Sequence, residues 1–301
     1  MSPTYRRRRW VSLLLLTLIG CLVLVTPASA AVTSPYKEQT VRTLHTVSER
    51  SVNAYPRIRV HTAGGAVIDG RLIGDTTYVA LRAFGDAYGG TVSYRSDTRT
   101  ATVRADGLTL TASDGGYVVY ANGRTLFADT PCVILSDGRM YAPVRTMAKA
   151  YGLTVEWQAS TRTVRLHGTM TPLADASVYY RADDVYWLSR IIRAESGGEP
   201  LLGQIAVGCV VLNRRDSADF PSTIWGVIFD RTYGTQFTPA ATGTVYRTPS
   251  AQSVLAAKIC LEGYSLDGDI LFFLEPNKST SSWIPRSRRY CFSIGHHDFY
   301  A

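Results

Sequence analysis

The sequence predicts an α+β protein in which a duplicated small α+β module is followed by a mostly helical domain. Two observations carry this prediction. A 26-residue segment that begins at Tyr78 recurs without gaps at Tyr141, with ten identical positions. Residues 183–214 then hold two consecutive stretches whose apolar residues recur with the period of a helix. A chain of 301 residues has room for two such domains.

Residues 1–30 have the organisation of a secretory signal peptide. Arg6 to Arg9 form a basic region, Val11 to Val25 an apolar core, and Ala28-Ser29-Ala30 a cleavage sequence of small residues. An uncleaved membrane anchor and lipidation at Cys21 are the alternatives. The core is short for a membrane span, and apolar residues continue beyond Cys21, so both are disfavoured. We expect a secreted, extracytoplasmic protein without a stable membrane span after the leader is removed.

The charge of the chain does not indicate a nucleic-acid-binding protein. The formal net charge is +8, and Arg6 to Arg9, which supply half of it, leave with the leader. The remainder is too small to hold a phosphate backbone. A mildly basic chain is compatible with an anionic cell wall.

Four cysteines follow the leader, and none has the C-x-x-C spacing of a metal or redox site. In an exported protein we expect Cys260 to pair with Cys291, because both lie in the last domain. Cys209 falls within an apolar helix and is expected to be a core residue. The pairings that involve Cys132 remain alternatives.

Residues 31–57 are polar and lack a sustained period, so they are expected to be a linker before the duplicated module at residues 58–168. In its first copy, Leu81 to Tyr88 predicts a short helix that Gly89 ends, and residues 91–94 and 100–103 alternate as two strands. The second copy repeats this order over residues 144–166. Neither copy can bury its own core, so we expect the two to pack together, or with the intervening strands at residues 108–110 and 117–120, into one α+β module.

The second copy, YAPVRTMAKAYGLTVEWQASTRTV from Tyr141, resembles the copper amine oxidase N-terminal domain. That resemblance implies a non-catalytic module of exported bacterial proteins, used for attachment or spacing. Neither copy holds the histidine cluster that a copper site needs. Arg82 and Arg145 occupy equivalent helix starts, where a structural role is favoured over contact with a ligand. The ligand of the module is not specified by its sequence.

A second linker is predicted at residues 169–182, which include Pro172 and mostly small or polar residues. A helix then starts near Asp183, with Asp183 or Asp184 as its cap, and Gly197 and Gly198 end it. The residues on its apolar face are Val185, Leu188, Ile191, Ile192 and Glu195. Pro200 opens a second helix, LLGQIAVGCVVLNR, which is apolar enough to be buried nearly all round.

Glu195 is the residue on which the functional hypothesis depends. Desolvation disfavours a charged carboxylate on an apolar helix face, so its pKa is expected to be raised, as a general acid requires. The alternative is a partly exposed residue at the end of a helix, because the apolar face of a helix is often imperfect.

Five blocks follow in a fixed order over residues 183–301: RAESGGEP, GQIAVGCVVLNR, FPSTIWGVIF, QFTP and IGHHDFY. Together they resemble the cell wall hydrolase family of the spore cortex-lytic enzymes. The resemblance implies a lysozyme-like, mostly helical domain that cleaves peptidoglycan glycan strands during sporulation or germination, commonly as a lytic transglycosylase. The catalytic glutamate of the family falls on Glu195.

Glycosidases usually need a second carboxylate, and none is evident near Glu195 in the sequence. A lytic transglycosylase does without one, because the C6 hydroxyl of muramic acid is the nucleophile and leaves a 1,6-anhydro end. Glu262 and Glu275 are too scattered along the chain to be assigned, so a hydrolase stays open.

We expect no cofactor and no metal, because His296 and His297 lack a helical pairing of metal ligands. For each aromatic candidate, a place in the core is favoured over stacking on sugar. These candidates are Trp225, Phe237, Tyr246, Trp283 and Tyr300. Asn213 has the alternative role of a helix cap. The candidates for substrate binding are Glu199, Gln204, Asn213, Gln236, Phe237, Trp283, His297 and Tyr300.

This chain departs from the family at His296, where asparagine is common, and at Glu275-Pro276, where the family has asparagine and proline. These departures concern contacts at the rim of the site and the preference for substrate.

Two other function classes remain: a non-catalytic wall- or coat-binding structural protein, and a zinc-dependent amidase that cuts the peptide stem. The expected partner is the peptidoglycan glycan strand in the cell wall or spore envelope, with an accessory spore or wall protein left open. The choice between vegetative wall and spore cortex is also open.

Overall fold

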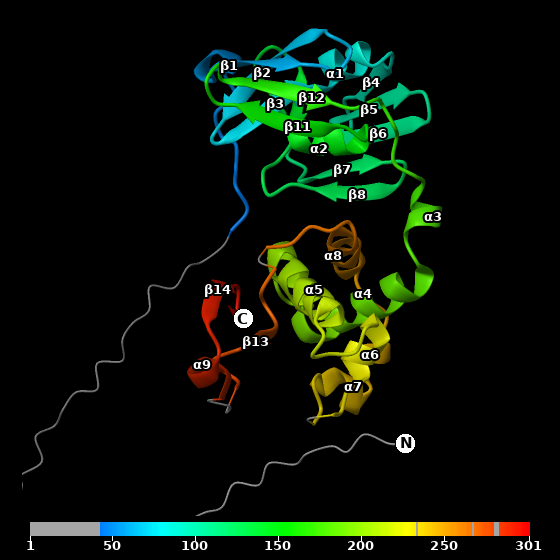
Figure 1. Ribbon diagram of the computed structural model, residues 1–301, viewed down its shortest axis with the longest axis vertical. Coiled ribbons are helices and arrows are strands. Elements are labelled where there is room, and N and C mark those ends of the chain that lie inside the picture. The colour runs from blue at the N-terminus through cyan, green and yellow to red at the C-terminus, as the bar shows by residue number, and fades with distance from the viewer. Residues whose placement is uncertain (1–42, 233, 267, 280–282) are drawn as a thin grey trace, which may run out of the picture. The chain divides into compact units, whose positions relative to one another are not determined.

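The computed structural model describes residues 43–232, 234–266, 268–279 and 283–301 (Figure 1). All of them belong to one compact unit, Gln39–Ala301. The predicted signal peptide and Cys21 lie outside the described residues. Within those residues, no helix has the length and apolar character needed to cross a membrane.

The N-terminal part consists of two sheets and two short helices, shown in blue to green in Figure 1. The seven-stranded sheet has the order β11-β12-β1-β2-β3-β10-β9, and the five-stranded sheet runs from β4 to β8 in sequence order. The first sheet contains β1 (Arg57–His61), β2 (Val67–Ile73), β3 (Thr76–Ala80), β9 (Val133–Ile134), β10 (Met140–Pro143), β11 (Thr154–Gln158) and β12 (Thr163–His167). The second contains β4 (Thr91–Arg95), β5 (Thr100–Ala105), β6 (Leu108–Ser113), β7 (Val118–Ala121) and β8 (Arg124–Phe127).

The repeat has the predicted local structure. Helices α1 (Leu81–Ala87) and α2 (Val144–Ala150) each precede a hairpin, and both predicted intervening strands are present as β6 and β7. The turns of the two hairpins place Arg99 and Arg162, which are equivalent in the repeat, at positive φ of 49° and 51°. The copies share one core, as expected, because Phe84 of the first copy packs edge-to-face on Tyr151 of the second. Their hairpins nevertheless enter different sheets.

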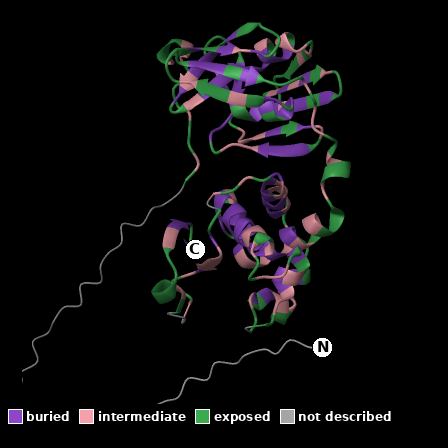
Figure 2. Ribbon diagram, in the orientation of Figure 1, coloured by how far each residue is buried: buried purple, intermediate pink, exposed green. Residues whose placement is uncertain are grey.

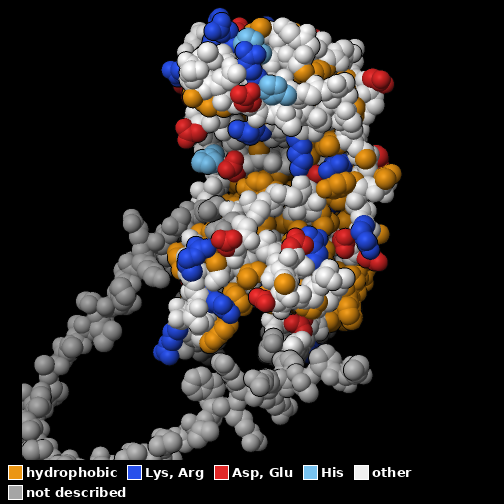
Figure 3. Space-filling view, viewed as in Figure 1, with side chains coloured by type: hydrophobic (Ala, Val, Ile, Leu, Met, Phe, Trp, Pro, Cys, Tyr) orange, Lys and Arg blue, Asp and Glu red, His pale blue; other side chains and the backbone are white. Residues whose placement is uncertain are grey.

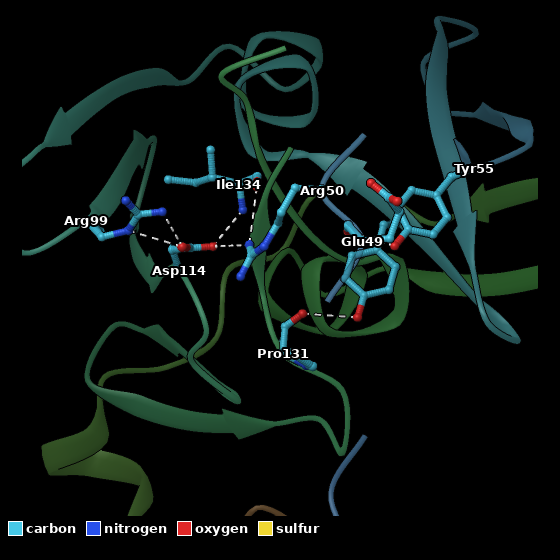
Figure 4. Close-up of polar contacts among 8 residues, drawn as sticks. Glu49, Arg50, Tyr55, Arg99, Asp114, Pro131 and Ile134 are labelled. Atoms are coloured by element: carbon cyan, nitrogen blue, oxygen red, sulfur yellow. Dashed lines mark hydrogen bonds and ion pairs between the residues drawn. The ribbon is translucent and has the colours of Figure 1, made fainter. Parts of the chain in front are cut away.

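Residues 43–56, the described part of the first predicted linker, are packed rather than loose. Val47, Val52 and Tyr55 contact a buried cluster. Figure 4 shows Arg50 reaching Asp114 from one side and Arg99 from the other, with 2.8 Å between Arg50 Nη1 and Asp114 Oδ1. The absence of a period in the sequence therefore reflects irregular backbone that is fixed by long-range contacts.

The C-terminal part is mostly helical, with one three-stranded sheet of order β13-β15-β14. The segment predicted as the second linker contains the short helix α3 (Ala176–Tyr179). The helices that follow are α4 (Ala182–Ser196), α5 (Leu201–Asp216), α6 (Ile224–Phe229), α7 (Thr238–Thr242), α8 (Ala251–Leu261) and α9 (Trp283–Ser287). The strands are β13 (Phe272–Leu274), β14 (Tyr290–Ile294) and β15 (His297–Tyr300).

Helices α4 and α5 form as predicted, except for the cap of α4. The N-cap is Arg181, and its side chain makes no capping bond. Asp183 and Asp184 instead lie in the first turn, where their charge interacts favourably with the helix dipole. Gly197 ends α4, and Pro200 precedes α5. Helix α5 is buried without interruption over residues 202–211, as its composition predicts, and it is largely purple in Figure 2.

The predicted disulfide bond between Cys260 and Cys291 is wrong. Cys260 is a buried thiol on α8, and its Sγ lies 3.3 Å from the carbonyl oxygen of Ile205 on α5. Cys209 is its neighbour, since the two thiols interact with each other. Helix α8 thus turns Cys260 into the core beside Cys209.

A buried ion pair joins β8 to the end of α8. Arg124 donates from Nε and Nη2 to the carboxylate of Glu262 at 2.9 and 2.7 Å. The hydroxyl of Tyr180 donates to the same carboxylate at 2.7 Å, and Lys149 Nζ donates to the Glu262 carbonyl oxygen. Side chains from the repeat module, the predicted second linker and the helical part therefore meet at one residue.

Candidate active site

Glu195 lies at the end of α4 in a groove of about 1000 Å³. The groove is bordered by α5, the segment before α7, strand β13 and α9. A second cavity, of about 540 Å³, extends along residues 193–199. The two cavities share the lining residues Glu195, Glu275, Lys278 and His297. A long ligand could therefore lie across Glu195 and contact the protein on both sides of it.

Glu195 is half-buried in the last turn of α4. Burial raises its pKa from 4.5 to about 7, and the charge of Arg214 acts in the opposite direction. The rise agrees with the direction predicted from the apolar face of α4. A carboxyl group with this pKa retains its proton in about half of the molecules at neutral pH, so it can act as a proton donor.

Arg214 is the residue of this site that the sequence reasoning missed. It is 5% exposed, lines the same groove, and donates from Nε to the carbonyl oxygen of Leu271 at 2.7 Å. Its Nη1 is buried without a hydrogen-bond partner among the described residues. Its guanidinium lies 5.2 to 5.5 Å from the ring centres of Phe220, Phe237 and Phe272.

This environment is unfavourable for a charge, and burial lowers the pKa of Arg214 to about 10. A charged group kept in such a place indicates a role in binding or chemistry rather than in stability. The sequence contained a signal for it, because Arg214 follows Val207 and Val211 by seven and three residues and so continues a buried stripe of α5.

Glu199 is held by the turn that precedes β15. The backbone N–H of His296 donates to Glu199 Oε2 at 3.0 Å, and His296 Nδ1 lies 2.8 Å from Oε1. Burial alone would raise the pKa of Glu199, but these bonds and the nearby histidines lower it. Gly295 has a φ of 57°, and a Cβ there would collide with the Glu199 carboxylate. Glu199 thus lines the second cavity, but its carboxylate is already hydrogen-bonded to His296.

His297 lies at the junction of the two cavities. Its ring is buried, and burial lowers its pKa. Its Nδ1 lies 3.9 Å from Glu199 Oε1 and has no hydrogen-bond partner among the described residues. Nowhere in the described part of the chain do three or more His, Cys, Asp or Glu side chains form a group that could hold a metal ion.

Five of the predicted site residues line the large groove: Glu195, Gln236, Phe237, Trp283 and His297. Trp283 is 53% exposed and lies edge-to-face on Phe272, so the predicted core position is wrong for it. Phe237 is buried and forms the floor of the groove, in agreement with the core prediction. Trp225 and Tyr246 are also exposed, contrary to that prediction, but they do not line the groove.

Gln204, Asn213 and Tyr300 line neither cavity, so their predicted place in the site is corrected. Gln204 is buried between α5 and α8, where its amide donates to the Glu199 carbonyl oxygen and accepts from Ser253. Asn213 donates to the carbonyl oxygen of Ile270, and Ser217 rather than Asn213 is the C-cap of α5. Tyr300 is buried in the small sheet beside Tyr290. The sequence could not place these three residues, because the neighbours of each come from distant parts of the chain.

The structure brings other carboxylates to Glu195 that the sequence left scattered. Asp219, Asp230 and Glu275 line the large groove, and Glu275 also lines the second cavity. Glu275 forms an ion pair with Lys278, with 2.9 Å between Oε2 and Nζ. Glu275 is therefore the candidate for a second catalytic carboxylate.

Two domain families match this chain. Residues 198–300 match the family described as Cell Wall Hydrolase, and residues 66–166 match the Copper amine oxidase N-terminal domain. The spore cortex-lytic enzyme of Bacillus cereus is 38% identical over 120 residues, which cover 40% of this chain and 45% of that protein. The spore cortex-lytic enzyme of Oceanobacillus iheyensis is 34% identical over 129 residues, or 43% of this chain and 45% of that protein.

The chain thus spans less than half the length of these two relatives. Among solved structures, the catalytic domain of the germination-specific lytic transglycosylase SleB from Bacillus anthracis is similar, with 38% sequence identity and a TM-score of 0.37. The similarity covers 40% of this chain and 97% of that one.

Proposed function

From the premise that residues 198–300 belong to the cell wall hydrolase family, we propose that this chain cleaves the glycan strands of peptidoglycan with Glu195 as its general acid. The observation that carries the proposal is the position of Glu195. It lies in a groove of about 1000 Å³ with a pKa raised to about 7, beside a buried Arg214. A proton donor in a groove is what cleavage of a glycosidic bond requires.

The chemistry begins with transfer of the Glu195 proton to the oxygen of the leaving sugar. The carboxylate that results is negative, and the charge of Arg214 favours that form, because it lowers the pKa of Glu195. Arg214 is buried and Glu195 is half-buried, so their interaction is stronger than it would be at the surface. Arg214 would therefore stabilise the product of proton transfer.

For the second half of the reaction we propose attack by the C6 hydroxyl of muramic acid on C1 of the same sugar, as in a lytic transglycosylase, with the hydroxyl proton passing to the Glu195 carboxylate. The ion pair of Glu275 with Lys278 supports this choice over hydrolysis, since it engages the candidate second carboxylate. A hydrolase would need Glu275 to leave Lys278 and activate water.

The lining of the groove is suited to a saccharide. Trp283 presents an exposed ring, and Gln236 presents an amide that can bond an N-acetyl group. Lys278 and Arg288 also line the groove and would attract the carboxylates of peptidoglycan. We propose extracytoplasmic action on wall or cortex, with residues 1–30 as the export signal. An accessory spore or wall protein stays a prediction.

Mass spectrometry of released muropeptides tests the proposal. The full-length mature chain and its Glu195→Gln and Glu275→Gln variants would be incubated with purified vegetative peptidoglycan and with spore cortex. Anhydro ends that vanish with Glu195→Gln and persist with Glu275→Gln are expected. Reducing ends lost in both variants would instead indicate a hydrolase with two carboxylates. No release from either substrate would leave a wall-binding protein as the better hypothesis.

A further inference from the structure

The duplication places an exposed aromatic ring on the same strand of each copy. Tyr94 on β4 is 49% exposed and Trp157 on β11 is 43% exposed, and the two are equivalent in the repeat. Large aromatic side chains exposed to water are unfavourable for solubility alone. The two rings lie in different surroundings, because the two hairpins belong to different sheets.

The ring of Trp157 borders a cavity of about 430 Å³ in the seven-stranded sheet. The cavity is lined by the turn between β2 and β3, the end of β8, the start of α2 and the strands β11 and β12. Polar groups converge there from distant parts of the chain. Asp75, Asp129, Thr76 and Arg145 line it, together with Thr130, whose hydroxyl is already bonded to Tyr78.

The two equivalent arginines have different roles. Arg82 Nη2 donates to the backbone carbonyl oxygen of Val92 at 3.2 Å and so supports its own copy. Arg145 lines the cavity, is exposed, and makes no hydrogen bond or ion pair to any residue in the described part of the chain. The structural role favoured from the sequence thus fits Arg82, whereas the N–H donors of Arg145 are available to a ligand.

We propose that this Trp157 cavity binds a peptidoglycan glycan strand, with a sugar ring stacked on Trp157 and a carbonyl oxygen of an N-acetyl or lactyl group accepting a hydrogen bond from Arg145. An aromatic face beside hydroxyl, carboxylate and guanidinium groups matches a saccharide, which has an apolar face and a rim of hydroxyl groups. The carbonyl oxygens of the N-acetyl and lactyl groups can accept hydrogen bonds from a guanidinium. The choice of glycan rests on the function proposed above, and the site is separate from the groove at Glu195.

The site is tested by sedimentation of the full-length mature chain with purified insoluble peptidoglycan. Every variant would carry Glu195→Gln, so that the substrate is not degraded and the catalytic groove contributes equally. Trp157→Ala is expected to weaken binding about tenfold, as loss of one stacked ring would. Arg145→Ala should weaken binding too, and Trp157→Phe should restore most of it. Tyr94→Ala is the matched control, because it removes the equivalent ring from the other copy and should change binding less than twofold.

Three outcomes would overturn the proposal. The first is equal binding by Trp157→Ala and its parent at unchanged thermal stability. The second is an equal loss with Tyr94→Ala, which would indicate a general effect of exposed rings. The third is loss of the Trp157 dependence after the stem peptides are stripped from the peptidoglycan, which would make the peptide the ligand. Muropeptide release by the chain with intact Glu195 is read separately, so the site and the catalytic proposal can fail independently.

Discussion

Glu195 and Arg214 line one groove, and burial shifts the pKa of each toward its neutral form. The pKa of Glu195 rises to about 7 and that of Arg214 falls to about 10. Both shifts cost stability, because a folded state that disfavours a charge must hold it at neutral pH. Such costs are typical of residues kept for function, and they lead to two predictions for these side chains.

Glu195→Gln is expected to stabilise the fold at alkaline pH. The folded chain binds the Glu195 proton more tightly than the unfolded chain, so this contribution is complete below pH 4.5 and is lost as the pH rises through about 7. At pH 8 the variant should gain about 2–3 kcal/mol in free energy of unfolding, and near pH 4.5 almost nothing. Urea denaturation at both pH values measures this. An equal difference at both would contradict the raised pKa.

Arg214→Met is expected to change the pH dependence of turnover. The general acid works only when protonated, so kcat should fall above pH about 7 in the parent. Without the opposing charge of Arg214, the pKa of Glu195 should be higher, and this alkaline limb should move to higher pH while kcat decreases. Stability should not fall, because an apolar side chain replaces a poorly paired buried charge.

The control for this experiment is Arg288→Met, which removes an exposed arginine from the same groove. It should affect KM without moving the alkaline limb, because an exposed charge is screened by water. An unmoved limb in Arg214→Met would mean that Arg214 does not act on Glu195.

Among the helices, α5 is the element on which the catalytic half is assembled. It is buried along most of its length and packs against both α4 and α8. Gly208 permits the close approach of these helices, because a Cβ there would lie 2.7 Å from Cys260 Sγ and 2.9 Å from Ile192 Cδ1. Helix α4, which carries Glu195, is therefore positioned by a glycine on its neighbour.

Gly208→Val should lower the free energy of unfolding by about 1–3 kcal/mol, since added methyl groups must displace packed side chains. Gly198→Val is the matched control, because nothing lies within 4 Å of a Cβ at that position. It should change stability by less than about 0.5 kcal/mol. Thermal or urea unfolding of both variants provides the comparison, and equal losses would argue against close packing at Gly208.

For the whole molecule, Glu262 is one point where the repeat module and the helical part are joined. Its side chain and that of Arg124 are both buried, and burial alone would raise the pKa of Glu262. The hydrogen bonds from Arg124 and Tyr180 lower that pKa instead. Elsewhere, acidic and basic side chains are interspersed over the face drawn in Figure 3.

Glu262→Gln should destabilise the protein by about 3 kcal/mol, because it leaves the Arg124 guanidinium buried without a counter-charge. The loss should shrink as the pH falls, since the lowered pKa means that this stabilisation is present above the ordinary carboxyl pKa and disappears below it. Asp216→Asn breaks the more exposed pair with Arg215 and should cost less than about 1 kcal/mol. Similar losses in both variants would contradict the role of this junction.

The sequence alone determined those features that depend on neighbours along the chain. The period of apolar residues predicted α4, α5 and the helices and strands of both repeat copies, because a single element shows which of its faces is apolar. The same reasoning placed Glu195 on a buried face and gave the direction of its pKa. The resemblance of the ordered blocks to cell wall hydrolases located the candidate acid and several residues of the groove.

Only the tertiary structure decided which faces meet. The helical period of the sequence could not show that Arg214 lines the groove with Glu195 or that Cys260 lies beside Cys209. Nor could it show that the side chain of Gln204 accepts a hydrogen bond from Ser253. It also could not separate Arg145 from Arg82, whose local sequences are equivalent. These pairings join segments far apart in the chain, and they are fixed by packing and by hydrogen bonds that form once the elements assemble.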